Sequence, residues 1–332
     1  MLKWHDFSYT FIGDFMLRTK ALRKIFLTTL TLFVLLTVFT ITNSKTENVL
    51  KTNLEIEDIA GFKTDVIYLL NDKGLLVKTK ILLEGNTAEE KINKLLLNLT
   101  EGSSNSFPEG LKKLIPKGTV VNNVMVGNNL VTVDFSKKLL KVSSDMEKPM
   151  VTAIVYSILE LGNYEGVSIL VDGKVLDKYP NSLEEIPSVI NKSIGINKNF
   201  SITSYNNINK VVIYYLENID NNLYYVPVTK YVNDERDKIK IIVEELASSY
   251  IYESNLMSFL NSNVRLLDYK EDNDIMYLNF NDYLFDGNDK ILEEVLYSLA
   301  YSVFDNYNVS MVSFMVNGQR INYVDREDNV IK

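Results

Sequence analysis

Cysteine is absent from this chain of 332 residues, and histidine occurs only once, as His5. Without cysteine the chain has no disulfide framework, no thiolate metal site, no cysteine nucleophile and no lipid-modified cysteine anchor. One isolated histidine excludes a histidine-dependent triad, and the sequence holds neither a glycine-rich phosphate loop nor an H-E-x-x-H motif. The acidic pairs Glu293-Glu294 and Asp282 with Asp286 read as solvated surface residues. We therefore expect no enzyme activity, no cofactor and no metal site.

A surplus of basic residues is also missing. Acidic residues outnumber basic ones and give a net charge of -8. Binding to nucleic acid is not expected, because phosphate neutralisation needs clustered lysine and arginine. The hydrophobic share of 46% is that of a globular protein, and the length suits about two domains.

The most informative feature that is present is a hidden duplication. Residues 115–174 and 260–319 follow one pattern, 145 positions apart and without a gap. The apolar positions are kept while the polar ones drift, in the matched pairs Val131–Phe135 with Met276–Phe280, Tyr156 with Tyr301, and Val167–Gly173 with Val312–Gly318. Two copies of one fold are therefore predicted.

The N-terminal region predicts a membrane anchor. Residues 25–41 are uncharged and consist of Leu, Ile, Val, Phe and Thr, a run close to the length that spans a bilayer. Four basic residues between positions 18 and 24 precede the run, so the positive-inside rule keeps the N-terminus cytoplasmic. We expect a cytoplasmic leader (1–24), a transmembrane helix (25–42) and an extracytoplasmic stalk (43–61). The alternative is a cleaved signal peptide, although the run exceeds the usual apolar segment and no small-x-small cleavage site follows.

Each copy predicts the order strand, strand, helix, strand, strand, helix, strand. In the first copy Asn71–Gly74 is a hairpin turn signal, and Thr87-x-x-Glu90 and Ser144-x-x-Glu147 are capping boxes ahead of the two helices.

This order predicts an α+β fold made of two tandem small two-layer sandwiches, each an antiparallel or mixed sheet backed by two helices. One face of each sheet then stays available for solvent or a partner. The boundaries are 62–176 for the first repeat, 177–208 for a linker and 209–322 for the second repeat.

Tyrosine is abundant, with 20 residues in the chain. Tyr214, Tyr215, Tyr224 and Tyr225 lie on the predicted first hairpin of the second repeat. Tyrosine is enriched at protein interfaces, which makes these four candidate contact residues. The strand propensity of tyrosine explains the same residues without any partner.

Several segments of the first repeat form a recognisable set: Ala88–Gly102, the I-P-x-G-T turn at Ile115–Thr119, Val131–Ser136, Ile154–Ile158 and Val167–Lys174. This set resembles the GerMN domain family of sporulation and spore germination proteins, whose members commonly carry tandem domains behind a membrane anchor. The resemblance covers residues 62–175 well and 209–320 weakly. In the second repeat the turn has become Leu260–Val264, and the lipid anchor common in the family is missing because the chain has no cysteine.

The resemblance implies a fold similar to ring-building motifs and a non-enzymatic scaffold that supports a channel complex between mother cell and forespore. The turn residues Ile115, Pro116, Gly118 and Thr119 carry the resemblance and are candidate contact residues. We expect a single-pass protein of the cell membrane with both repeats outside, which contacts other envelope proteins or copies of itself. The alternative is a module that binds cell-wall peptidoglycan or peptide.

Overall fold

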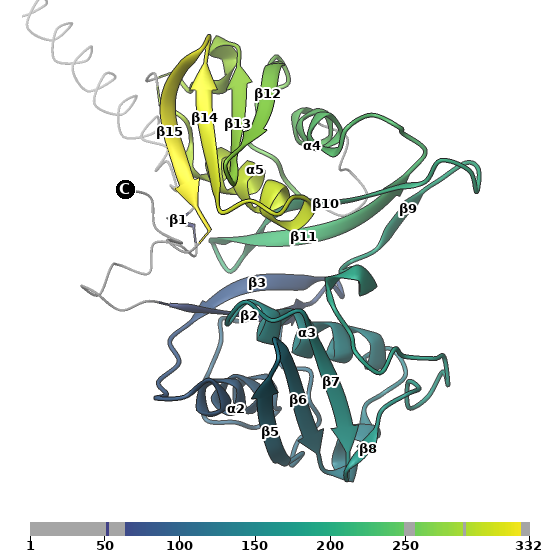
Figure 1. The fold of residues 1–332 in the computed structure, drawn as a ribbon. Coiled ribbons are helices and arrows are strands. Elements are labelled where there is room, and N and C mark those ends of the chain that lie inside the picture. The colour runs from purple at the N-terminus through teal and green to yellow at the C-terminus, as the bar shows by residue number, and fades with distance from the viewer. Residues whose placement is uncertain (1–50, 53–63, 249–255, 288–289, 327–332) are drawn as a thin grey trace, which may run out of the picture. The chain divides into compact units, whose positions relative to one another are not determined.

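The computed structural model describes residues 51–52, 64–248, 256–287 and 290–326, which belong to one compact unit (Figure 1). Both repeats contain the predicted strands and helices in the predicted order, together with additional strands that were not predicted. The elements of the first repeat are β2 (Asp65–Asn71), β3 (Leu76–Ile81), α2 (Ala88–Leu99), β4 (Leu111–Lys112), β5 (Val121–Gly127), β6 (Leu130–Phe135), η1 (Lys137–Lys141), α3 (Glu147–Leu159), β7 (Gly166–Val171) and β8 (Lys174–Val175). Those of the second are β10 (Asn209–Ile219), β11 (Asn222–Val232), α4 (Lys238–Ala247), β12 (Leu266–Asp272), β13 (Ile275–Phe280), η3 (Asp282–Leu284), α5 (Glu293–Asn306), β14 (Met311–Val316) and β15 (Gln319–Asp325).

Each repeat contains a four-stranded mixed sheet, in the order β5-β6-β7-β8 or β12-β13-β14-β15. The two central strands are parallel, because the helix α3 or α5 connects them, and the outer pairs are antiparallel. Alternate residues of β6 are buried, as Val131, Val133 and Phe135 face the helices. The hairpins β2–β3 and β10–β11 belong instead to a third sheet, which both repeats share.

The structure differs from the predicted two-layer sandwich, because each repeat has three layers. Figure 1 shows α3 between the β2–β3 hairpin and the β5–β8 sheet. The sequence contains the reason: Met150–Ile158 in α3 and Val295–Phe304 in α5 are buried at every position. A helix that is apolar all round must be covered on both sides.

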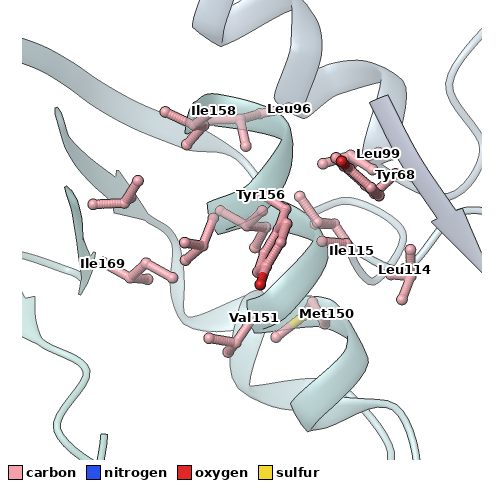
Figure 2. Close-up of a cluster of buried hydrophobic side chains, with 14 of the residues drawn as sticks. Tyr68, Leu96, Leu99, Leu114, Ile115, Met150, Val151, Tyr156, Ile158 and Ile169 are labelled. Atoms are coloured by element: carbon pink, nitrogen blue, oxygen red, sulfur yellow. The ribbon is translucent and has the colours of Figure 1, made fainter. Parts of the chain in front are cut away.

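The core of the first repeat surrounds α3 (Figure 2). The rings of Tyr68 and Tyr156 meet edge to face, with centroids 5.6 Å apart, and Leu96 and Ile115 pack around them without exposure. Truncating one such fully buried aromatic, for example Phe135→Ala, should destabilise the fold by about 3–5 kcal/mol.

The two predicted capping boxes have different outcomes. Thr87 Oγ1 accepts a hydrogen bond from Glu90 N (3.2 Å) and caps α2 as predicted. The second prediction is wrong, because α3 follows Met146 and no side chain caps it. The buried Glu147 carboxylate instead accepts from the backbone N–H groups of Asn181 (2.7 Å) and Ser182 (3.0 Å). These two bonds tie the start of α3 to the connecting segment.

The segment predicted as a linker packs closely on both repeats. Val167 and Ile190 exchange two backbone hydrogen bonds of 2.8 Å, and Ile186 and Ile196 are buried. The segment contains η2 (Lys192–Ile194) and β9 (Asn199–Ser201), which pairs in parallel with β11. Ile186, Ile190 and Ile196 of this asparagine-rich segment therefore belong to the core.

The predicted leader and transmembrane helix lie outside the described residues. Within the described ranges, no helix is long and apolar enough to cross a membrane. Of the predicted stalk only β1 (Lys51–Thr52) is described, and it pairs in parallel with β11.

Candidate interaction surface

The two repeats join through equivalent strands. β3 and β11 are the second strands of their hairpins, and they pair antiparallel with Lys78 opposite Tyr225. Continuing this register places Val77 opposite Val226, and both valines are fully buried. Equivalent strands that pair antiparallel are related by a local two-fold axis, as in an isologous dimer contact. The contact inside this one chain thus has the geometry of a homodimer interface.

Asn197 completes the ladder at a position where proline interrupts it. The same register brings Leu76 opposite Pro227, which has no N–H to donate. The Asn197 amide donates to both Leu76 O and Pro227 O at 2.8 Å, and its oxygen accepts from Leu76 N at 2.8 Å. Asn197 adopts a positive φ of 46°, which asparagine tolerates better than most residues. The connecting segment therefore helps to join the hairpins.

Equivalent tyrosines also meet at this contact. The hydroxyl groups of Tyr68 and Tyr214 lie 3.4 Å apart. Each tyrosine donates its backbone N–H to a serine on the buried helix of its own repeat, Ser157 or Ser302, at 2.9 Å in both cases. Because the serines occupy the same helix position, the two repeats hold their hairpins by the same bond.

Glu217 is a third point of contact. Its buried carboxylate accepts a hydrogen bond from the side-chain amide of Asn71 and pairs with Lys73 Nζ at 2.6 Å. Asn71 and Glu217 sit at matching places in the first strands of the two hairpins, so this contact also joins equivalent positions.

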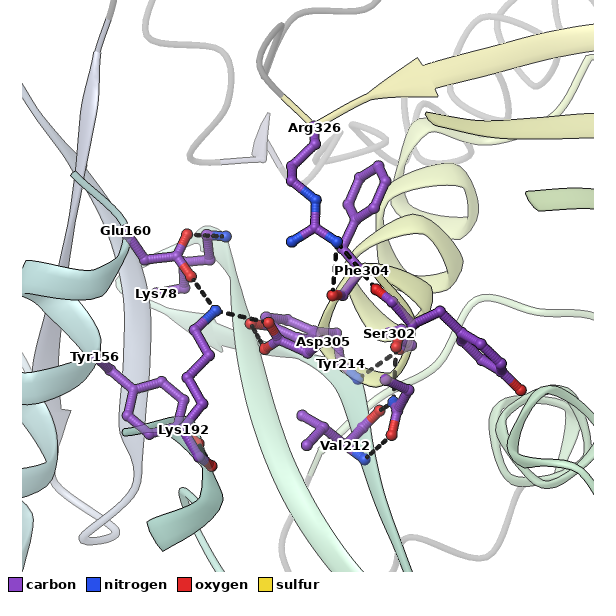
Figure 3. A network of polar contacts seen from close by, with 12 residues as sticks. Lys78, Tyr156, Glu160, Lys192, Val212, Tyr214, Ser302, Phe304, Asp305 and Arg326 are labelled. Carbon is purple, nitrogen blue, oxygen red and sulfur yellow. Dashed lines mark hydrogen bonds and ion pairs between the residues drawn. The ribbon is translucent and has the colours of Figure 1, made fainter. Parts of the chain in front are cut away.

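A network of charges spans the ends of the two buried helices (Figure 3). Lys192 Nζ, from η2, lies 2.8 Å from Glu160 Oε1 and 2.7 Å from Asp305 Oδ1. Lys78 Nζ lies 3.1 Å from the other Glu160 oxygen. Tyr214 adds a hydroxyl that donates to Asp305 at 2.7 Å. A charge network with most of its oxygens hydrogen-bonded fixes a single arrangement of the groups that form it.

The charges in the network stabilise one another. Burial alone would raise the pKa of Glu160, but Lys192 and Lys78 outweigh it and hold this pKa well below its usual range. Burial would likewise lower the pKa of Lys192, and Asp305 and Glu160 raise it above its usual range. Both groups are therefore ionised at neutral pH.

The four tyrosines predicted as contact residues lie inside the chain, each at most 3% exposed: Tyr214, Tyr215, Tyr224 and Tyr225. Tyr214 contacts the first repeat, and the Tyr225 ring packs on Tyr297 and Tyr301. Lys78 Nζ sits 4.0 Å above the Tyr301 ring. Contact with another protein stays a prediction for these residues, and their burial gives them a role between and within the repeats.

The predicted turn Ile115–Thr119 lies between β4 and β5. Ile115 is fully buried and its N–H donates to Leu99 O (2.9 Å), while Thr119 donates from Oγ1 to Pro116 O (2.7 Å). Gly118 has a φ of 77°, which explains the glycine of the motif. In this turn Lys117 and Gly118 are exposed and Pro116 is partly exposed, and a partner at this point stays a prediction.

Apart from Tyr214 and Tyr225, the residues that join the repeats were not among the predicted site residues. Lys192 and Asn197 lie in the predicted linker, where nothing in the sequence marks them. Glu160 and Asp305 did carry a signal, because both are acidic and 145 positions apart.

Two further kinds of site are a cavity and a group of residues that could bind a metal ion. A cavity of about 500 Å³ lies between α4 and β12, lined among others by Val243, Glu244 and Arg265. In the described part of the chain, no group of three or more His, Cys, Asp and Glu residues is placed to hold a metal ion.

Both repeats match the model of a known protein family. The family model described as "Germane: Sporulation and spore germination" matches residues 66–177 and 212–322. The chain belongs to the Germane family. The two matches cover the first and the second repeat, and the first match extends one residue into the predicted linker.

Relatives of this Germane chain agree with the assignment. It is 26% identical over 294 residues to the spore germination protein GerM of Bacillus subtilis (strain 168), covering 83% of this chain and 79% of that protein. It is also similar in fold to the solved tandem GerMN domains of the sporulation protein GerM from Bacillus subtilis, with a TM-score of 0.70 and 24% identity over 78% of this chain and 92% of that one. The predicted resemblance to GerMN-domain proteins is confirmed.

Proposed function

We propose that this Germane protein is a non-enzymatic, membrane-anchored scaffold that supports sporulation or spore germination by binding other envelope proteins or further copies of itself. Membership of the Germane family over both repeats supports a role in sporulation or spore germination. The apolar run at 25–41 with basic residues before it supports an anchor that holds both repeats outside the membrane.

The observation that carries the proposal is a pair of equivalent edge strands. β5 and β12 lie at the ends of their sheets, and no described strand pairs with their outer edges. Such an edge offers backbone N–H and C=O groups to a strand of another protein. Both strands contain a bulge at the same relative position, Asn122 or Leu267. The bulge shortens the available ladder and so favours a defined partner over open-ended stacking.

Exposed apolar side chains accompany these edges. Met125 in β5 and Leu267 in β12 are each 53% exposed. Methionine is enriched at protein interfaces, whereas lysine is depleted there and blocks strand addition at edges. A lysine at either position should therefore weaken a contact at the edge and leave the fold intact.

The test is complementation of a gene deletion in the host of this protein. We expect deletion to lower the yield of spores or their germination, and the unchanged chain to restore it. The double variant Met125→Lys/Leu267→Lys should fail to restore it at equal protein level. The control Leu97→Lys, a half-exposed position on α2, should restore it fully. A deletion without effect, or full rescue by the double variant, would contradict the proposal.

A further inference from the structure

Three neighbouring strands place two aromatic rings and a lysine in one row. Phe200 in β9 lies opposite Tyr231 in β11, and Tyr231 lies opposite Lys210 in β10. Residues opposite each other on paired strands point to the same face of a sheet. The three side chains therefore form a row across the strands, here named the aromatic row.

The two rings in the aromatic row are stacked on each other, and the Phe200 ring is exposed while Tyr231 is partly buried. Phe200 and Tyr231 are stacked, with centroids 4.8 Å apart and planes 10° from parallel. Phe200 is nevertheless 64% exposed. The hydroxyl end of Tyr231 lies against Gly195, where a β-carbon would come within 3.3 Å of it. A large apolar ring held in a fixed orientation at the surface is typical of a binding site rather than of a core.

Positive charge gathers beside the rings. Lys210 Nζ donates to the carbonyl of Ser193 (2.8 Å), not to a carboxylate. Burial lowers the pKa of Lys210, the positive charges of Lys238 and Lys198 lower it further, and the negative charge of Asp305 opposes them. Across the described residues, none of the three takes part in an ion pair. In a chain of net charge -8, this is a local excess of positive charge that an anion would satisfy.

We propose that the aromatic row binds an acidic glycan. The C–H face of a sugar ring would lie on the exposed face of Phe200, whose π electrons favour the slightly positive hydrogens. A carboxylate on the same glycan would pair with Lys198 and Lys238. A sparsely charged glycan fits better than a nucleic acid, because the many phosphates of a nucleic acid would be repelled by the acidic remainder of the chain. The site is separate from the edge strands, so it can fail while the scaffold role holds, and the reverse.

The experiment measures binding of the full-length chain, in detergent, by isothermal titration with four probes. They are peptidoglycan glycan strands whose stem peptides have been removed, so that their lactyl carboxylates are free, a neutral N-acetylglucosamine oligomer, polyglutamate and single-stranded oligothymidine. We expect the acidic glycan to bind about tenfold more tightly than any other probe. Phe200→Ala and the double variant Lys198→Gln/Lys238→Gln should each weaken that binding about tenfold. The control is Tyr283→Ala, which removes another ring that is 54% exposed and should change nothing.

Three results would overturn the proposal. The first is the absence of binding to the acidic glycan by a chain whose thermal unfolding is normal. The second is equal binding by Phe200→Ala and the unchanged chain. The third is equal or tighter binding of polyglutamate or oligothymidine, which would mean that charge alone, or a nucleic acid, accounts for the lysine cluster.

Discussion

Glu160 and Asp305 hold the same position at the ends of α3 and α5, and both bind the ammonium group of Lys192, at 2.8 Å and 2.7 Å. Two acidic groups at a local two-fold axis would repel each other, and one lysine from the connecting segment turns that repulsion into a bridge. The duplicated helices are thereby joined at their ends. This relationship makes the two repeats one body, and it can be tested residue by residue.

Removing Lys192, which bridges Glu160 and Asp305, should lower the free energy of unfolding. In Lys192→Met the Asp305 side chain, only 7% exposed, loses its ion pair, and Glu160 keeps only Lys78. Breaking a buried ion pair from one side costs about 3–5 kcal/mol, and the partial exposure of Lys192 places the expected loss at about 3 kcal/mol in urea unfolding. Lys148→Met removes an exposed pair with Glu184 and should cost less than about 1 kcal/mol. Equal losses in the two variants would contradict the role of the network.

The contribution of Glu160 should depend on pH. Burial disfavours its ionised form, but Lys192 and Lys78 hold its folded pKa below the usual value of about 4.3. Its stabilisation is therefore complete above about pH 4.3 and is lost as the pH falls through the lower folded pKa. The raised pKa of Lys192 acts in the opposite sense, so its contribution is complete below about pH 10.4 and is lost as the pH rises through the folded value.

The measurement compares Glu160→Gln with the unchanged chain by urea unfolding at stepped pH. The difference in unfolding free energy should be largest between about pH 5 and pH 9 and should shrink below about pH 4. A difference that stays constant down to pH 2 would mean that the carboxylate charge is not what stabilises the contact.

Replacing Asn197 should destabilise the folded chain, although this residue lies in a connecting segment. Asn197→Ala leaves the N–H and C=O of Leu76 and the C=O of Pro227 without their partner, and each unsatisfied buried group costs about 1–3 kcal/mol. Asn197→Asp keeps the acceptor for Leu76 N but loses both donated bonds. We expect both variants to unfold at lower urea concentration. Asn191→Ala, which removes only an exposed bond to Ser193, is the control and should have a small effect.

Ser157 and Ser302, which accept a hydrogen bond from the hairpins, should contribute equally to the free energy of unfolding. Ser157→Ala and Ser302→Ala each remove the acceptor of a tyrosine N–H at 2.9 Å, and each should cost about 1–3 kcal/mol. Chemical denaturation of the two single variants measures both losses. Losses that differ by more than about 2 kcal/mol would show that the two hairpins are not held alike.

Much of the fold could be predicted because the duplication repeats local signals. The spacing of 145 residues matched Phe135 with Phe280 and Tyr156 with Tyr301, and the structure buries all four. The hairpin turn at Asn71–Gly74 and the Thr87 cap depend on neighbouring residues only. The three-layer arrangement was not predicted, because the apolar residues of α3 were assigned to one face of the helix. The structure buries this helix on all sides.

The contact between the repeats could not be predicted in the same way. It depends on long-range pairs such as Lys192 with Asp305 and Asn197 with Leu76, which no periodicity or motif links. Tyr214 and Tyr225 were predicted as candidate contact residues, but the sequence could not distinguish an interface inside the chain from one with another protein.

The most direct test of the joined repeats uses the absence of cysteine. Leu97→Cys and Tyr283→Cys, both at exposed positions of different repeats, allow two spin labels to be attached without background. Pulsed electron resonance on the full-length chain should give one narrow distance distribution, which broadens when Lys192→Met and Asn197→Ala are added. A broad distribution in the otherwise unchanged chain would contradict the claim that the two repeats form one body.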